Sequence, residues 1–258
     1  MGHIISIANQ KGGVGKTTTA VNLAASLAVA EKSCLLVDCD PQGNATTGLG
    51  KDKKELKNGL YELIFGQASE EEVIIGTSLP GLSLIGSNIH LIGAEVEMVS
   101  ADEREYRLKK KMIVLKERYD FIFLDCPPSL GFLTLNALTA ADSVLVPLQC
   151  EYYALEGLSQ LLDTIRAVRN SLNPTLRLVG ILLTMHDSRN NLSIQVEEEA
   201  RRHFGEIVFQ TMIPRNVRLS EAPSYGEPVI LYDIKSKGAQ SYLSLARELI
   251  SRGAGIDG

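Results

Sequence analysis

The sequence predicts an α/β fold, a doubly wound and mostly parallel sheet with helices on both faces. Short β-branched runs alternate along the chain with stretches of helical periodicity, and this alternation implies parallel strands joined by right-handed crossovers. Several runs, such as Ile122-Phe123-Leu124 and Val144-Leu145-Val146, are apolar at consecutive positions, as in strands covered on both faces. The 258 residues are 45% hydrophobic and 22% charged, which is the composition of a globular protein rather than a disordered chain.

Strands are expected at 3–8, 33–37, 82–86, 121–124, 143–147 and 178–183, with a weaker strand at 207–210. Helices are expected at 16–30, 102–118, 132–140, 155–172, 192–204 and 239–252, and the charge-rich segment 95–118 is interpreted as a surface helix. No linker, low-complexity tract or internal repeat divides the sequence, so we expect one domain over residues 1–258.

The first helix could be mistaken for a signal peptide, because Ala28-Val29-Ala30 resembles a cleavage site. However, Asn22 and Ser26 interrupt its apolar run, and a strand and a glycine-rich loop precede it. No segment approaches the roughly 18 uninterrupted apolar residues of a membrane helix. We therefore expect a buried helix in a cytoplasmic protein.

The four cysteines, Cys34, Cys39, Cys126 and Cys150, form no C-x-x-C pair and have no histidine at zinc-site spacing. Each lies in or beside an apolar run. They are expected to be small buried hydrophobic residues in a reducing compartment.

A glycine-rich segment, Gln10-Lys11-Gly12-Gly13-Val14-Gly15-Lys16-Thr17-Thr18, follows the first expected strand and opens the first expected helix. This is the context of a phosphate-binding loop. Its glycines allow backbone N–H groups to converge on an anion, and the helix N-terminus adds its dipole. Lys16 is expected to reach the β- and γ-phosphates, and the Thr17 hydroxyl to hold Mg²⁺. The standard pattern has glycine where Gln10 stands, so this loop is a deviant one.

Carboxylates follow two of the expected strands. Asp38 and Asp40 come at the end of the second strand, and Asp125 ends the strand at 121–124. Since the carboxyl ends of parallel strands share one edge of the sheet, where ligands bind, these side chains should lie near the phosphate loop. Asp125 suits the outer shell of Mg²⁺, and Asp40 suits orienting the attacking water. Asp38 could serve either the metal or the support of its loop.

The string K-G-G-V-G-K-T-T resembles the deviant Walker A group of ATPases. The resemblance implies that Lys11 is the signature lysine, which reaches across a dimer to the partner's nucleotide. The residues then expected to contact ATP or ADP are Lys11, Gly12, Gly13, Val14, Gly15, Lys16, Thr17 and Thr18.

Longer strings, D-P-Q-G-N-A-T at 40–46, D-C-P-P-S-L-G at 125–131, Q-C-E-Y-Y-A-L-E-G-L-S-Q-L at 149–161 and I-P-R-N-V-R-L-S-E-A-P-S at 213–224, resemble the chromosomal ParA (Soj) partition ATPases. This resemblance implies that ATP and Mg²⁺ drive formation of a homodimer, which binds double-stranded DNA without sequence preference. A ParB-type partner would then stimulate hydrolysis during chromosome or plasmid segregation, with the protein at the nucleoid. Pro214 and Asn216 match the loop that contacts adenine in relatives. The phosphate loop begins within the first dozen residues, so we expect no N-terminal helix-turn-helix extension.

The net charge of −5 seems to argue against DNA binding. However, residues 1–168 carry 15 basic and 21 acidic side chains, whereas residues 169–258 carry 11 and 10. The candidate DNA-binding residues lie in this more neutral part: Arg189, Arg218, Lys235 and Lys237, with Arg215 near them. Phosphate contacts need a local basic face only, and a dimer would double their number, so DNA binding should be weak in the monomer and ATP-dependent.

Three other classes of protein have sequence requirements that can be compared with this chain. A MinD-like membrane-cycling ATPase would need a basic amphipathic C-terminal helix with bulky apolar residues, and the tail at 253–258 has neither. No stable membrane binding is therefore expected. An iron–sulfur carrier would need a suitably spaced second cysteine beside Cys126. A non-enzymatic scaffold that merely binds nucleotide would not need the full set of Lys16, Thr17, Asp40 and Asp125. We therefore expect an ATPase that is slow without its partner.

Overall fold

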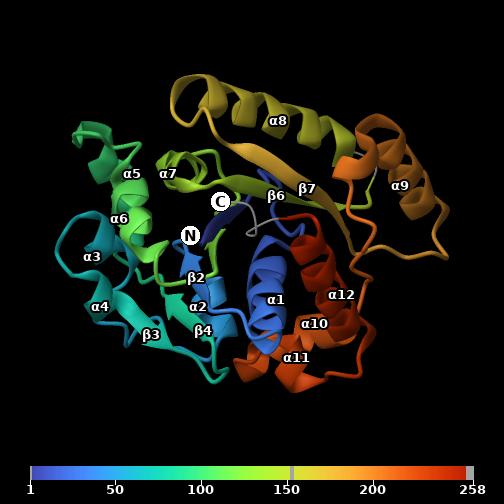
Figure 1. Ribbon diagram of the computed structural model, residues 1–258, viewed down its shortest axis with the longest axis horizontal. Coiled ribbons are helices and arrows are strands. Elements are labelled where there is room, and N and C mark those ends of the chain that lie inside the picture. The colour runs from blue at the N-terminus through green and yellow to red at the C-terminus, as the bar shows by residue number, and fades with distance from the viewer. Residues whose placement is uncertain (1, 152–153, 254–258) are drawn as a thin grey trace.

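The computed structural model describes residues 2–151 and 154–253. These residues form a seven-stranded sheet with helices packed around it (Figure 1). The strands are β1 (His3–Ile7), β2 (Cys34–Asp38), β3 (Ile74–Gly76), β4 (Leu82–Ile85), β5 (Phe121–Asp125), β6 (Ser143–Gln149) and β7 (Arg177–Thr184). Their order across the sheet is β3-β4-β2-β5-β1-β6-β7. All neighbouring pairs are parallel except β3 and β4. The predicted α/β fold is confirmed.

The α-helices are α1 (Lys16–Val29), α2 (Asn44–Gly48), α3 (Leu60–Ile64), α4 (Glu70–Val73), α5 (Leu91–Glu97), α6 (Arg107–Leu115), α7 (Phe132–Ala140), α8 (Ala154–Ser171), α9 (Asn191–Phe204), α10 (Val217–Glu221), α11 (Val229–Tyr232) and α12 (Lys237–Ser251). Three 3₁₀ turns accompany them: η1 (Met98–Ser100), η2 (Gly205–Ile207) and η3 (Ala222–Tyr225). None of the described helices is both long and apolar enough to cross a membrane. Most of the C-terminal tail, whose composition lacks the features of a membrane anchor, lies outside the described residues, at 254–258.

The helices cover the sheet in two layers. Helices α1 and α12 lie side by side on one face, with α10 and α11 beside them (Figure 1). Helices α3 and α5–α9 cover the other face. Because successive strand residues point to opposite faces, Ile4 packs in one hydrophobic cluster and Ile5 in the other. Both faces are therefore apolar, as the consecutive apolar runs in the sequence predicted.

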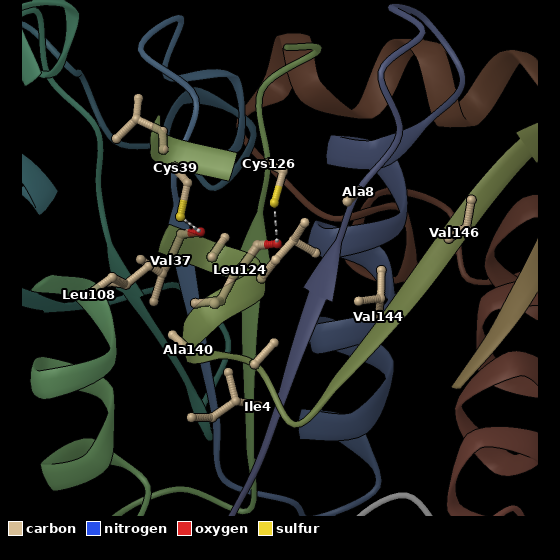
Figure 2. Close-up of a cluster of buried hydrophobic side chains, with 14 of the residues drawn as sticks. Ile4, Ala8, Val37, Cys39, Leu108, Leu124, Cys126, Ala140, Val144 and Val146 are labelled. Atoms are coloured by element: carbon tan, nitrogen blue, oxygen red, sulfur yellow. Dashed lines mark hydrogen bonds between the residues drawn. The ribbon is translucent and has the colours of Figure 1, made fainter. Parts of the chain in front are cut away.

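Figure 2 shows Cys39 and Cys126, which directly follow β2 and β5, in the same buried hydrophobic cluster as Ala140 of α7. The thiols of Cys39 and Cys126 each donate to the carbonyl two residues earlier, at 3.8 Å. All four cysteines are free and buried, and burial raises the pKa of Cys34, Cys126 and Cys150 to about 12. The expectation that the cysteines are small buried residues is confirmed.

Three expectations about elements were wrong. The weak strand at 207–210 does not form: Ile207 ends the 3₁₀ turn η2, Val208 makes an isolated bridge to Ile181, and the Glu248 carboxylate accepts from the N–H groups of Gln210 and Thr211. The helix expected at 102–118 is shorter, because Glu103 has a left-handed backbone (φ 47°) and α6 begins only at Arg107. For the same reason the charge-rich segment 95–118 is several short pieces rather than one surface helix.

Candidate nucleotide-binding site

The phosphate loop connects the end of β1 to the start of α1 at the centre of the sheet. Gly13 and Gly15 have φ angles of 76° and 88°, a left-handed conformation that glycine adopts without strain. In the described part of the chain, the backbone N–H groups of residues 12–18 donate no hydrogen bond to another protein group. Seven N–H groups at a helix N-terminus thus form a site suited to an anion such as a phosphate.

Two lysines flank this loop in different ways. Lys16 is only 7% exposed, and its ammonium donates to the carbonyl of Lys11 at 3.0 Å. Burial lowers the pKa of Lys16, and the nearby Asp125 opposes this shift. Lys11 is exposed, and its ammonium lies 2.6 Å from the carboxylate of Glu151, just beyond the end of β6. Lys16 therefore points into the loop, whereas Lys11 points toward the β6–α8 connection.

Asp38 and Asp125 face each other in register at the ends of the neighbouring strands β2 and β5. Both carboxyls are fully buried. Burial raises the pKa of Asp38 to about 6 and that of Asp125 well above its usual range, and the charge of Asp38 raises the pKa of Asp125 further. The structure thus places two buried acidic side chains together at the edge that carries the phosphate loop, and their proximity opposes the ionisation of both at once.

The oxygens of Asp38 are occupied by its own loop. One accepts from the N–H of Asp40 at 3.2 Å, and the other from the N–H and the hydroxyl of Thr46 at 2.8 and 2.7 Å. Of the two roles expected for Asp38, these contacts match loop support. The loop they hold in place carries Asp40, which is 7% exposed and whose Oδ1 accepts from the N–H of Gln42 at 2.8 Å. Its Oδ2 accepts no hydrogen bond from the described residues.

Asp125 differs, because neither of its buried oxygens has a hydrogen-bond partner within the described chain. Lys16 and the Thr17 hydroxyl favour its ionised form, but neither meets the geometry of a hydrogen bond to it. A buried carboxylate without a partner is costly unless a cation or donor satisfies it. The described residues contain no cluster of three or more acidic, histidine or cysteine side chains suited to a metal. Such a sparse site fits Mg²⁺, which keeps several waters and phosphate oxygens among its ligands.

A cavity of about 520 Å³ opens beside the phosphate loop. Its wall combines loop and helix residues with the end of β7: Gly15, Thr18, Met185, Pro214, Asn216 and Tyr242. The Oδ1 of Asn216 is buried there and has no partner among the described residues. Mostly apolar walls with a few polar groups suit a flat heteroaromatic ring. The expected base-contacting residues Pro214 and Asn216 thus lie where a nucleotide held by the loop could reach them.

Two of the four candidate DNA-binding residues, Arg189 and Arg218, form ion pairs. Arg189 makes a bidentate pair with Asp187, at 2.9 and 3.0 Å, and this contact lowers the pKa of Asp187 to about 2. Arg218 contacts Glu221 at 2.8 Å and Asp233 at 3.2 Å.

The two lysines lie at the start of α12. The backbone N–H of Lys235 donates to Asp233, the carboxylate that also binds Arg218. Lys237 lines a groove with Pro214. Around α10–α12 the structure therefore gathers Arg218, Lys235 and Lys237, and it interleaves them with carboxylates.

Sequence reasoning did not single out several residues of this region. Thr46 holds Asp38, Glu151 binds Lys11, and Met185 and Tyr242 line the cavity. Glu151 could have been found, because it follows β6 and strand ends share the ligand-binding edge. Nothing local in the sequence marks Tyr242, which reaches the site only through the packing of α12 on α1.

Comparison with known proteins agrees with this geometry. A family model described as an AAA domain matches residues 2–178. The chromosome partitioning protein ParA of Myxococcus xanthus is 59% identical over 252 residues, covering 98% of this chain and 89% of that one. The sporulation initiation inhibitor protein Soj of Bacillus subtilis is 56% identical over 253 residues, covering 98% and 100%.

Among solved structures, a cobyrinic acid a,c-diamide synthase from Mycobacterium smegmatis with bound ATP analogue and magnesium superposes with a TM-score of 0.87. It is 38% identical, and the match covers 98% of this chain and 96% of that one. The end-to-end identity to the partitioning proteins is the more specific of these findings. The chain belongs to the ParA/Soj family of chromosome-partitioning ATPases.

Proposed function

We propose that this protein is a Mg²⁺-dependent ATPase that forms a homodimer when it binds ATP and then binds double-stranded DNA without sequence preference. A ParB-type partner stimulates hydrolysis, which releases the DNA, and the cycle serves chromosome or plasmid segregation at the nucleoid in the cytoplasm. The observation that supports nucleotide binding is a set of polar groups at one edge of the sheet that have no hydrogen-bond partner among the described residues. These are the N–H groups of residues 12–18, the carboxylate of Asp125 and the amide oxygen of Asn216.

Each unpaired group fits one part of Mg·ATP. The loop N–H groups and the Lys16 ammonium bind phosphate oxygens, since they supply convergent donors and a buried positive charge. The Thr17 hydroxyl would bind Mg²⁺ directly, and Asp125 would bind the water molecules that surround the ion. Mg²⁺, when bound, neutralises charge that develops on the phosphates. The Asn216 oxygen accepts from the 6-amino group of adenine, and Pro214 packs against the ring.

Hydrolysis needs a water held in line with the terminal phosphate, because phosphoryl transfer depends mainly on positioning and electrostatics. Asp40 is the residue we assign to this water. Its Oδ1 is fixed by the Gln42 N–H, and its Oδ2 remains able to accept a hydrogen bond. Asp38 and Thr46 hold the backbone on which Asp40 sits. Lys11 of one protomer adds positive charge at the other protomer's phosphates, so turnover depends on the dimer.

The DNA contacts are assigned to Arg189, Arg218, Lys235 and Lys237. Single ion-paired arginines bind a phosphate weakly, since the phosphate must displace a carboxylate. A dimer doubles the number of phosphate contacts, and affinity rises steeply with that number through counterion release. This makes DNA binding conditional on ATP even in a chain of net charge −5.

The test is a DNA-binding titration of the purified protein with ATP, with ADP and without nucleotide, at two salt concentrations. The proposal expects binding with ATP only, weakening as salt rises, and equal for unrelated DNA sequences. Binding that is independent of nucleotide, or absent in all three states, would contradict it. A parallel titration with anionic lipid vesicles tests the alternative of a MinD-like membrane-cycling ATPase. ATP-dependent binding to vesicles in place of DNA would indicate that alternative.

A further inference from the structure

The phosphate loop is tied to the segment that follows β6 by the two residues that set it apart. Lys11 donates to Glu151 Oε2 at 2.6 Å. Gln10, which stands where the standard loop has glycine, donates to the carbonyl of Gly157 at 3.2 Å and to the side chain of Gln160 at 2.9 Å. Both deviant positions therefore make their side-chain contacts with the β6–α8 connection and the first turns of α8.

The Glu151 carboxylate, which accepts the hydrogen bond from Lys11, is itself held in place by neighbouring groups. The side-chain amide of Gln149, the last residue of β6, donates to the second oxygen of Glu151. The backbone N–H of Glu151 donates to the carbonyl of Gln149 at 2.8 Å, and its carbonyl accepts from the N–H of Ala154 at 3.0 Å. Glu151 is thus a positioned partner for Lys11 within the same chain, with both carboxylate oxygens engaged.

We propose that Glu151 is a positioning residue that holds Lys11 on its own protomer and competes for it with the partner protomer's nucleotide. This inference rests on the proposed ATP-dependent dimer. One ammonium cannot stay at 2.6 Å from Glu151 and also reach phosphates across the interface. Each dimer that forms therefore breaks two Lys11–Glu151 pairs, and Glu151 raises the protein concentration at which dimers appear.

The size of the effect follows from the exposure of the pair. The side chains of Lys11 and Glu151 are 42% and 46% exposed, and an exposed ion pair shifts an equilibrium by about 1.4- to 5-fold. Since two pairs break in each dimer, removing the Glu151 charge should lower the dimer dissociation constant by about 2- to 25-fold. High salt should shrink this difference, because it screens exposed charges.

The experiment measures dimerisation by sedimentation velocity with a slowly hydrolysed ATP analogue and Mg²⁺, for the parent protein and for Glu151→Gln. Glu117→Gln is the matched control: it removes the same charge from an exposed position before β5, at the opposite edge of the sheet. Glu151→Asp, which keeps the charge, should return the dissociation constant toward the parent value. Analogue affinity, measured by calorimetry below the dimerisation concentration, should be the same in all four proteins.

A Glu151→Gln dissociation constant that equals or exceeds the parent value would overturn the inference while leaving the dimer proposal intact. An equal decrease in Glu117→Gln would also overturn it, because the effect would then be one of net charge. A parent protein that stays monomeric with the analogue would refute the dimer proposal and this inference together.

Discussion

Thr46 offers a sharp test of how the structure supports Asp38. Its hydroxyl donates to the buried Asp38 carboxylate at 2.7 Å and accepts from the N–H of Ser87 at 2.9 Å, and Thr46 is itself fully buried. Thr46→Val keeps the shape but leaves both groups without their partner. A hydrogen bond to a charged group contributes about 1.5–3 kcal/mol, and an unsatisfied buried N–H costs about 1–3 kcal/mol. Because the surrounding structure relaxes in part, we expect the free energy of unfolding to fall by about 3 kcal/mol at pH 8.

The loss of stability caused by Thr46→Val should be larger at high pH than at low pH. The pKa of Asp38 is about 6 in the fold, above its usual value, so this group already lowers stability as pH rises from about 4 to 6. The Thr46 hydroxyl favours the ionised carboxylate, and its removal raises the pKa of Asp38 further. The variant should therefore lose more stability at pH 8 than at pH 5, where protonated Asp38 depends less on the donor.

Urea unfolding at both pH values measures this effect. Thr164→Val is the control, since its hydroxyl bonds only to a helix carbonyl at the surface of α8, and we expect a change within about 0.5 kcal/mol. A Thr46→Val loss below about 1 kcal/mol, or an equal loss at pH 5 and pH 8, would refute the reasoning.

Three further predictions concern the nucleotide and DNA. Lys16→Ala should reduce ATP affinity by at least about 100-fold in calorimetry, since it removes a buried charge-assisted contact to phosphate, and near-parent affinity would exclude that role. Asp40→Ala should bind ATP but lower the steady-state hydrolysis rate by about 100-fold or more, leaving a persistent dimer; unchanged turnover would remove Asp40 from water positioning. Arg218→Ala should dimerise normally but reduce the slope of log affinity against log salt by about 2 per dimer, because each protomer loses one phosphate contact. An unchanged slope would place the DNA face elsewhere.

The parts of the site that follow strand ends could be predicted from the sequence. The rule that parallel strands share a carboxyl edge was enough to expect Asp38, Asp40 and Asp125 near the phosphate loop, and the register of β2 and β5 places Asp38 opposite Asp125. The roles of these residues depend on contacts that spacing does not carry. Only the structure shows that the Asp38 carboxylate accepts a hydrogen bond from Thr46, whereas Asp125 has no hydrogen-bond partner among the described residues.

Elements and contacts made by distant packing could not be predicted. The edge strand β3 spans three residues, too few for a periodic signal. The expected strand at 207–210 does not form because Ile207 belongs to η2 and the N–H of Gln210 donates to Glu248, almost 40 residues later. The ion pairs of Arg189 and Arg218 depend on local structure that the sequence did not predict: Arg189 pairs with Asp187 in a loop, and Arg218 pairs with Glu221 three residues later on the short helix α10. Sequence could therefore nominate these arginines but not show that carboxylates already hold them.

The position of β1 at the middle of the sheet has a consequence for synthesis of the chain. Although β1 leaves the ribosome first, its neighbours are β5 and β6, so the strand that carries the phosphate loop has no partner strand until about residue 125 has emerged, and it is flanked on both sides only after about residue 150. The adjoining cavity closes only with Tyr242 in α12. A nascent chain therefore carries the phosphate-loop sequence long before it can hold a nucleotide, and only a nearly finished polypeptide can do so.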